Sequence, residues 1–241
     1  MTEVYGLNFY KNRHSRTVFS AEKILSVLLK NLPKIESGVD FGCGVGTWLS
    51  VLKNKGAMDV LGLDGMWVNR DLLEISKNEF KQVDFEAPIT LTKKYDLAIS
   101  LEVAEHISQN NAEQFVNSLA MASDFILFSA AILLQGGTNH INEQWQSYWC
   151  ELFSKKGYKC FDFIRNEIWH EKKIPVSYRQ NVLFYAKESL IDKLELFEKI
   201  TKDMVSLNVV HPESYLAKTD QMYSVRGSFK LLRKAVKKAF K

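Results

Sequence analysis

Short apolar runs alternate with longer amphipathic segments along most of the chain. The runs have the length of strands, and the near-continuous apolar core of residues 94–102 is typical of a strand buried on both faces of a parallel sheet. Residues 15–32 place apolar side chains at three- and four-residue intervals, which predicts a helix with one buried face. Strands are expected at 39–41, 59–65, 79–85, 94–102, 124–132, 158–165 and 181–187. Further helices are expected at 47–56, 112–123 and 144–157.

This alternation predicts an α/β fold: a doubly wound, mostly parallel seven-stranded sheet flanked by helices. We expect an N-terminal helical segment over residues 1–36 and the sheet domain over 37–187. Residues 188–241 follow as a C-terminal helical extension, with an amphipathic helix over 190–207 and a basic amphipathic tail. In such sheets ligands bind beyond the carboxyl ends of the strands.

The segment VDFGCGVGTW, residues 39–48, joins the first strand to its helix. Gly42, Gly44 and Gly46 allow a sharp turn and a close approach of a ligand to bare backbone, and the helix beginning near Thr47 directs N–H groups at the same place. A dinucleotide fingerprint would need a third glycine where Thr47 stands. Asp40, two residues before the first glycine, suits a cationic amine better than a pyrophosphate. The segment predicts a cofactor loop.

Two more acids end strands. Asp64 lies 18 residues beyond Gly46 at the end of the second strand, where a carboxylate can bind both hydroxyls of a ribose. Asp84 and Phe85 end the third strand, where the acid could accept a hydrogen bond from an adenine amino group and the ring could cover the base. Solvated acids at strand ends are the alternative for both positions.

Together, these motifs resemble the class I S-adenosylmethionine-dependent methyltransferases over residues 37–187. The resemblance implies S-adenosylmethionine as cofactor, a Rossmann-like fold, and the same roles for Asp40, Asp64 and Asp84. The candidate cofactor contacts are Asp40, Phe41, Gly42, Gly44, Gly46, Thr47, Asp64, Gly65, Asp84, Phe85 and Glu102.

After the fourth strand, Glu102, Glu105 and His106 are spaced so that a helical turn would face all three toward one point. This E-x-x-E-H segment resembles the ubiquinone-biosynthesis O-methyltransferases. It is also similar to the small-RNA 3′-terminal 2′-O-methyltransferases, and that resemblance implies a magnesium site formed by Glu102, Glu105, His106 and His140. The alternatives are a base without a metal, or a structural turn in which Glu102 borders the cofactor, Glu105 caps a helix and His106 packs.

The loop QGGTNH, residues 135–140, is the second candidate for chemistry. Paired glycines followed by Thr, Asn and His predict a mobile polar segment beside the molecule that accepts the methyl group. A hydroxyl nucleophile benefits from a base, and histidine is the natural one at neutral pH. We therefore favour His140 as general base, with His106 and Glu105 as the other catalytic candidates.

Charge limits the choice of acceptor. The net charge of +4 arises from residues 226–241, which hold seven basic residues and no acid, so the rest of the chain carries −3. A body without a basic groove counts against nucleic acid. FSAAI, QGGTNHINEQWQSYW and DGMWVNRDLLEI resemble methyltransferase-domain proteins of polysaccharide and glycoconjugate clusters, which implies a glycan or another small molecule with a hydroxyl group.

No signal peptide, membrane-spanning run or metal-type cysteine spacing is evident, so we expect a cytoplasmic protein with ordinary cysteines. The tail GSFKLLRKAVKKAFK could contact an anionic membrane, bind an acidic partner or be a solvated terminus. The sequence thus favours O-methylation. Its rivals are a metal-dependent RNA methyltransferase, a non-catalytic methyltransferase-like module and, last, a dehydrogenase.

Overall fold

The computed structural model describes residues 7–193 and 205–239. The chain divides into two compact units, Met1–Asn208 and Val209–Lys241. The second unit begins at Val209, whereas the sequence places the start of the C-terminal extension at residue 188. No helix in the described part of the chain is long and apolar enough to cross a membrane.

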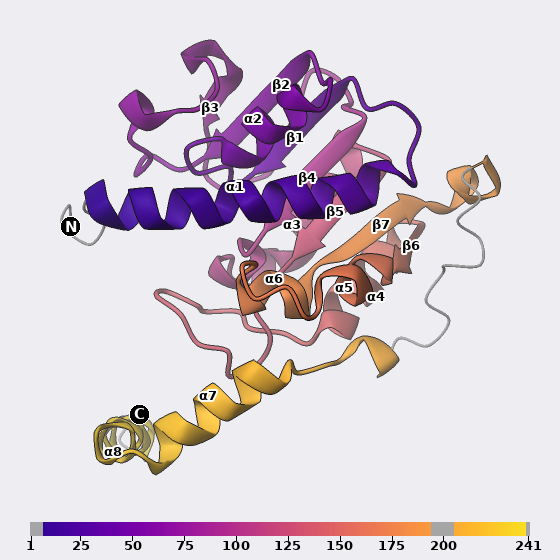
Figure 1. Cartoon of the computed structure of the whole chain (residues 1–241). Coiled ribbons are helices and arrows are strands. Elements are labelled where there is room, and N and C mark those ends of the chain that lie inside the picture. Colours follow the sequence, from indigo (N-terminus) through magenta and orange to yellow (C-terminus); the bar gives the residue numbers. More distant parts are fainter. Residues whose placement is uncertain (1–6, 194–204, 240–241) are drawn as a thin grey trace. The chain divides into compact units, whose positions relative to one another are not determined.

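One seven-stranded sheet forms the centre of the first unit (Figure 1). Its strands are β1 (Ser37–Phe41), β2 (Asp59–Asp64), β3 (Phe80–Gln82), β4 (Leu97–Leu101), β5 (Phe125–Ser129), β6 (Tyr158–Phe161) and β7 (Leu183–Lys187). They are arranged in the order β3-β2-β1-β4-β5-β7-β6, and only β7 runs antiparallel to its neighbours. The predicted doubly wound, mostly parallel sheet is confirmed.

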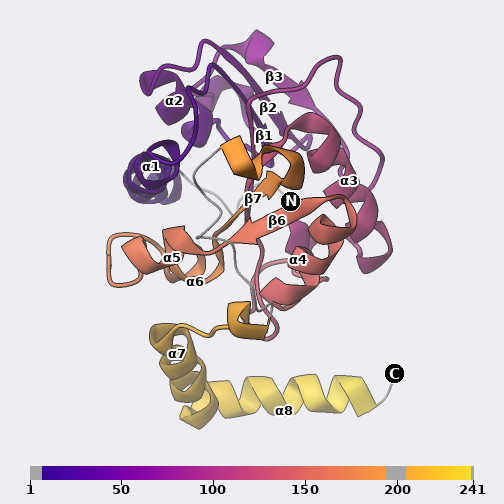
Figure 2. The same ribbon diagram turned by 90° about the vertical axis from the view of Figure 1, so that its right-hand side faces the viewer.

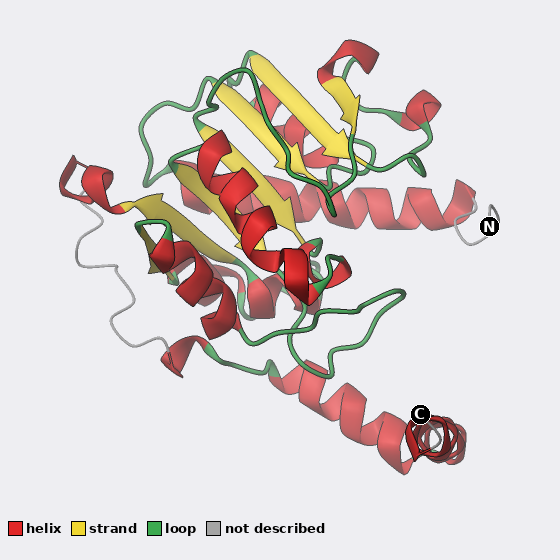
Figure 3. Cartoon of the chain, turned by 180° about the vertical axis from the view of Figure 1, so that it is seen from behind, coloured by secondary structure: helices red, strands yellow, loops and turns green. Residues whose placement is uncertain are grey.

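Helices cover both faces of this sheet (Figures 2 and 3). The helices of the first unit are α1 (Leu7–Leu29), α2 (Thr47–Asn54), α3 (Ala112–Ala122), α4 (Gln146–Lys155), α5 (Phe163–Ile168) and α6 (Val176–Asn181). Short 3₁₀ turns occur at Arg70–Leu72, Lys77–Glu79, Ala104–His106, Gln109–Asn111, Glu188–Lys193 and Val205–Leu207. In Figure 2, α1 and α2 lie on one side of the strands and α3 and α4 on the other.

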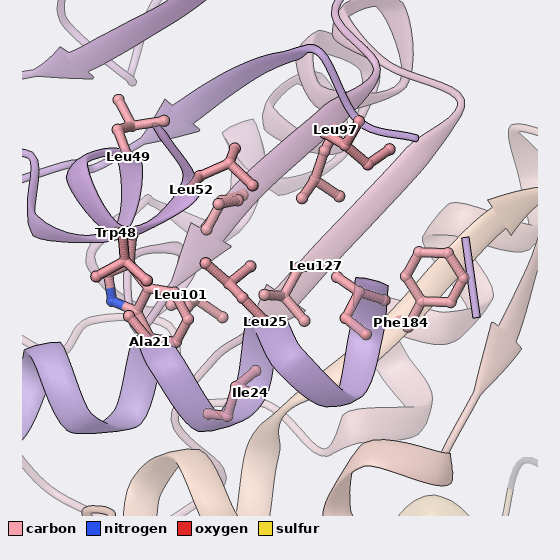
Figure 4. Packing of buried hydrophobic residues seen from close by; sticks show 14 of the residues in the cluster. Ala21, Ile24, Leu25, Trp48, Leu49, Leu52, Leu97, Leu101, Leu127 and Phe184 are labelled. Carbon is pink, nitrogen blue, oxygen red and sulfur yellow. The ribbon is translucent and has the colours of Figure 1, made fainter. Parts of the chain in front are cut away.

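The core has two parts because successive strand residues point to opposite faces. Leu97 and Ile99 of β4 join the cluster beneath α1 and α2, which includes Leu25 and Leu52 (Figure 4). Ala98, between them, joins the second cluster with α3 and α4. All five residues of β4 are buried, so its continuous apolar run is explained by burial on both faces.

Asp162–Arg165 does not continue the strand that the sequence predicts over residues 158–165. β6 ends at Phe161, and α5 begins at Phe163. Arg165 is almost completely buried, and its guanidinium pairs with Asp162 and donates hydrogen bonds to the carbonyls of Gln180 and Leu207, both at 3.0 Å. Only a helical turn brings Arg165 back over Asp162, and this pairing outweighs the strand preference of the apolar residues.

Two helices of the structure differ from the predicted ones at their ends. α1 begins at Leu7, earlier than the expected residue 15. The helix expected over 190–207 has 3₁₀ turns at its two described ends, and residues 194–204 lie outside the described residues. Cys43, Cys150 and Cys160 are buried free cysteines.

The second unit contains α7 (Pro212–Tyr223) and α8 (Val225–Ala239). Ser224 breaks the helical path with an extended backbone, and its hydroxyl accepts a hydrogen bond from the Gly227 N–H at 3.0 Å. A Cβ on Gly227 would lie 1.5 Å from the Gln221 carbonyl oxygen. The close approach of the two helices at this corner therefore requires glycine.

Replacing Arg165 with Leu should destabilise the first unit. The change leaves the Asp162 carboxylate and the Leu207 carbonyl without their partner and removes one of two donors to the Gln180 carbonyl, which we expect to lower the free energy of unfolding by about 3 to 5 kcal/mol. Chemical denaturation followed by circular dichroism measures this. Lys155→Leu, which removes an exposed cation from α4, should change the value by less than about 0.5 kcal/mol. Equal effects of the two substitutions would contradict this role for Arg165.

Candidate functional site

The glycine loop after β1 adopts backbone conformations that other residues rarely reach. Gly42, Gly44 and Gly46 have φ angles of 90°, 55° and 87°. A Cβ on Gly42 would lie 2.2 Å from a Val103 methyl group, and one on Gly46 would lie 2.8 Å from Ile75. A Cβ on Gly44 would meet nothing within 4 Å, so this glycine presents bare backbone to open space. α2 begins directly after the loop, so its first N–H groups are directed here.

Asp40 and Asp64 lie at the carboxyl ends of neighbouring strands, and both are almost completely buried. Asp64 accepts hydrogen bonds from the N–H groups of Gly44 at 2.7 Å and Gly65 at 2.6 Å. Burial raises the pKa of both carboxyl groups, and the charge of Asp64 raises the pKa of Asp40 further. No described residue donates a hydrogen bond to the Asp40 carboxylate. These features suit a cationic ligand group at Asp40.

Thr47, the first residue of α2, connects the loop to α1. Its hydroxyl donates to Glu74 at 2.6 Å, and Glu74 also pairs with His14 of α1 at 2.8 Å. The Glu74 N–H bonds to the Val45 carbonyl inside the loop. Glu74 therefore fixes the loop from the side, a role the sequence did not reveal because Glu74 lies in an irregular segment.

Trp67 is a second residue that the motifs missed. Its ring lies over Gly65, because a Cβ there would be 2.2 Å from the indole, yet its side chain is mostly exposed. The indole also contributes a hydrogen bond that lowers the pKa of Asp64, against the effect of burial. A tryptophan three residues after the acid that ends a strand was the available sequence signal.

The third strand is shorter than predicted: β3 ends at Gln82, so Asp84 and Phe85 follow the strand and do not end it. Asp84 is exposed, and its carboxylate accepts a hydrogen bond from the Glu86 N–H at 3.0 Å. The ring of Phe85 is buried against Phe41 and Phe115, with centroid distances of 6.1 and 5.6 Å. The structure therefore places both predicted aromatic contacts, Phe41 and Phe85, in the core that supports the strand ends.

Glu102 follows β4 with a φ of 57°, a strained conformation for a residue with a side chain. Gln135 and Asn181 each donate to one of its carboxylate oxygens at 3.1 Å, and the Glu102 N–H bonds to the Ser129 carbonyl. Burial raises the pKa of Glu102, and these hydrogen bonds oppose that rise. Gln135 and Asn181 are far from Glu102 in the chain, so no local pattern could have assigned them.

Glu105, His106 and His140 form a compact cluster, hereafter the Glu-His-His cluster. The 3₁₀ turn Ala104–His106 carries the first two. One ligand atom from each of the three side chains lies within 4.8 Å of the others. His140 Nε2 is 3.9 Å from Glu105 Oε1, and the two imidazoles meet edge to face with centroids 4.9 Å apart. Glu102, predicted as a fourth member, is bound instead to Gln135 and Asn181.

Backbone hydrogen bonds bring the loop between β5 and α4 to this cluster. The Glu105 carbonyl accepts from the N–H groups of Ile141 at 2.9 Å and Asn142 at 3.0 Å. The Asn139 carbonyl lies 3.2 Å from His106 Nδ1. A Cβ on Gly137 would lie 2.0 Å from His140 Nε2, so glycine is needed where the imidazole packs on the loop.

Glu143 orients His140. One of its carboxylate oxygens accepts from His140 Nδ1 at 2.9 Å and from the Gly136 N–H, while the other accepts from the Leu134 N–H at 2.9 Å. With Nδ1 as the donor, the lone pair of the neutral imidazole is on Nε2, which faces Glu105. The arrangement is that of a histidine base aligned by a carboxylate.

Glu105 has an unusual electrostatic position. It is fully buried, and neither carboxylate oxygen makes a hydrogen bond within the described part of the chain. Burial, with a further contribution from the charge of Glu102, raises the pKa of Glu105 to about 9. Burial also lowers the pKa of His106. At neutral pH the cluster therefore consists of a protonated acid beside a neutral His106, unless a cation binds.

Glu105→Gln should flatten the pH dependence of stability. Because the folded-state pKa lies above the unfolded value, the folded chain holds a proton that the unfolded chain loses, and stability declines as the pH rises toward the folded pKa. Between about pH 6 and about pH 8 the wild type should lose melting temperature that Glu105→Gln retains. Thermal melts in the presence of a chelator measure this. Glu151→Gln, at an exposed position, should follow the wild type. Parallel curves for all three proteins would refute the assignment.

Comparison with known proteins gives two consistent results. Residues 12–122 match the family model described as a methyltransferase domain. Magnesium protoporphyrin IX methyltransferase (ChlM) from Synechocystis PCC 6803 with bound SAM has a similar fold: it is 18% identical, with a TM-score of 0.52 over 77% of this chain and 88% of that one. DesVI from Streptomyces venezuelae is 13% identical, with a TM-score of 0.55 over 75% of this chain and 95% of that one. No curated protein matches the chain.

Both structural likenesses concern the fold, and the matched domain includes the glycine loop, Asp40, Asp64 and the E-x-x-E-H turn. Residues 12–122 therefore match a methyltransferase domain, and the first unit has a fold similar to that of these two structures.

Proposed function

We propose that the protein methylates a hydroxyl group of a small molecule or glycan, with His140 as the general base. The observation that carries this proposal is the Glu143–His140 pair, which fixes the imidazole with its basic Nε2 directed away from Glu143 and toward Glu105. S-adenosylmethionine, when bound, supplies a methyl group already activated by a sulfonium centre. The protein must then align the acceptor and remove its proton.

Binding of the cofactor is assigned to the glycine loop and the acids beside it. The buried Asp40 carboxylate, which has no described donor, would accept from a cationic amino group. Asp64 would bind a ribose diol, and the exposed Trp67 ring beside Gly65 would lie against the base. Gly44 offers backbone with no side chain in the way. Asp84 remains a predicted contact to the adenine amino group.

Contact between the cofactor loop and the turn that carries Glu105 and His106 supports transfer of a methyl group to an acceptor near His140. Gly42 of the cofactor loop packs against Val103, which lies between Glu102 and the 3₁₀ turn that carries Glu105 and His106. In-line methyl transfer gains most of its acceleration from holding nucleophile and methyl about 3 to 3.5 Å apart. A rigid connection between the two halves serves that purpose. The glycan class of acceptor rests on the sequence resemblance alone.

Calorimetry with S-adenosylmethionine tests the proposal first. The wild type should bind, and Asp40→Asn should weaken binding by about ten- to a hundredfold because a charge-assisted hydrogen bond is lost. Asp71→Asn, which changes an exposed acid, should bind normally. Methyl-labelled cofactor incubated with fractionated lysate should then place label in small molecules or glycan. A wild type that binds no cofactor would instead be a non-catalytic module.

The base assignment predicts separate effects on binding and turnover. His140→Gln should reduce label transfer about a hundredfold or more while cofactor affinity stays unchanged. Glu143→Gln should cause a smaller loss, because the amide oxygen still orients Nδ1–H but does not stabilise the imidazolium. Full transfer by His140→Gln would exclude His140 as base. Glu151→Gln provides the matched control.

A second candidate, metal-dependent 2′-O-methylation of RNA ends, is favoured by the Glu-His-His cluster. Its donors suit a divalent ion, since Glu105 has two buried oxygens without hydrogen bonds and a cation would restore its ionised form. Glu105, His106 and His140 Nε2 would hold the ion and leave it positions for substrate oxygens. Loss of transfer in EDTA, restored by magnesium, would favour this candidate. Transfer that survives EDTA and the change of both Glu105 and His106 to Ala would exclude it.

A further inference from the structure

We propose that α8 is a docking surface for an anionic lipid bilayer. Four apolar side chains on this helix, Val225, Phe229, Leu232 and Val236, recur at intervals of four, three and four residues and so form one stripe along it. Their side chains are 76%, 69%, 60% and 48% exposed. An apolar stripe of this length on an exposed helix is expected to have a partner.

The charged positions of the same helix define the chemistry of that partner. At 3.6 residues per turn, the sequence positions of Arg226, Lys230, Arg233, Lys234 and Lys237 fall beside and opposite the stripe on a helical projection. The last acid in the chain is Asp220, so nothing neutralises these cations within α8. An apolar stripe flanked by lysine and arginine matches the interface of a membrane, where acyl chains lie beneath anionic headgroups.

α7 adds a second exposed apolar face to the same unit. Tyr215, Leu216, Met222 and Tyr223 lie on one side of this helix, and each is more than half exposed. The glycine corner at Gly227 holds the two helices against each other. Tyrosine is suited to a membrane interface because its ring is apolar and its hydroxyl can stay in water. The unit 209–241 thus carries apolar side chains on both helices, and all but one of the cations within these two helices are on α8.

A second copy of the chain is a weaker match to this surface. Pairing two α8 helices along their stripes would bring two strongly cationic segments together, and residues 221–241 contain no acid to form ion pairs across the contact. A bilayer supplies both the apolar layer and the opposite charge in one plane. This inference rests on the second unit and does not depend on the proposed methyl transfer.

Sedimentation of the full chain with vesicles tests the inference. Vesicles of equal parts phosphatidylcholine and phosphatidylglycerol should bind the protein, phosphatidylcholine vesicles should bind it weakly, and added salt should release it. Phe229→Ala with Leu232→Ala should lower affinity at least about tenfold, since alanine preserves the helix but not the buried area. Lys230→Gln, Lys234→Gln and Lys237→Gln together should lower it about a hundredfold.

A matched control separates the stripe from general surface hydrophobicity. Met58→Ala with Met121→Ala removes two exposed apolar side chains from the first unit and should leave vesicle binding unchanged. Cofactor affinity, measured by calorimetry, should be the same in all variants. Absence of binding to anionic vesicles would overturn the inference. So would dimers in sedimentation velocity that Phe229→Ala with Leu232→Ala dissociates, or an oligonucleotide that binds α8 more tightly than the vesicles do.

Discussion

Parallel pairing of β1 with β2 on one side and β4 on the other is the constraint on which the site depends. Val39 is opposite Leu61 in one pairing and Ala98 in the other, so the three strands end at the same edge. Asp40, Asp64 and Glu102 come together there although they are far apart in sequence. The helices on the two faces bury the strands, and that burial makes the edge rigid enough to hold acids that water would otherwise solvate.

Those acids carry a stability cost that a ligand can offset. Asp40, Asp64 and Glu105 are buried and Glu102 is half-buried, and burial raises the pKa of each. Hydrogen bonds from the glycine loop, Gln135 and Asn181 compensate part of this cost for Asp64 and Glu102. Among described residues, no donor bonds to the Asp40 carboxylate and no side chain donates to the buried Glu105 oxygens. A cation at either place would stabilise the folded chain as well as bind to it.

Local sequence patterns predicted the features that depend on local geometry. The ends of β1 and β2, the three glycines and the turn at Glu105 and His106 follow from periodicity and spacing, and the structure places them as expected. Arg165 shows where this fails, because its pairing with Asp162 and two distant carbonyls converted a predicted strand end into a helix. Gln135 and Asn181 meet Glu102 only through the folding of a long loop and of α6. The sequence carries no local signal for such contacts.

The attachment of the His140 loop has an evolutionary consequence. The loop is held to the turn through the Glu105 carbonyl and the backbone N–H groups of Ile141 and Asn142. Ile141 is largely exposed, and its bond to the carbonyl uses only its backbone. Mutations at Ile141 can therefore accumulate without displacing the His140 imidazole, so a lineage can vary the surface of this loop while His140 stays in place. Gly137, in contrast, cannot accept a side chain without displacing the His140 imidazole that packs against it.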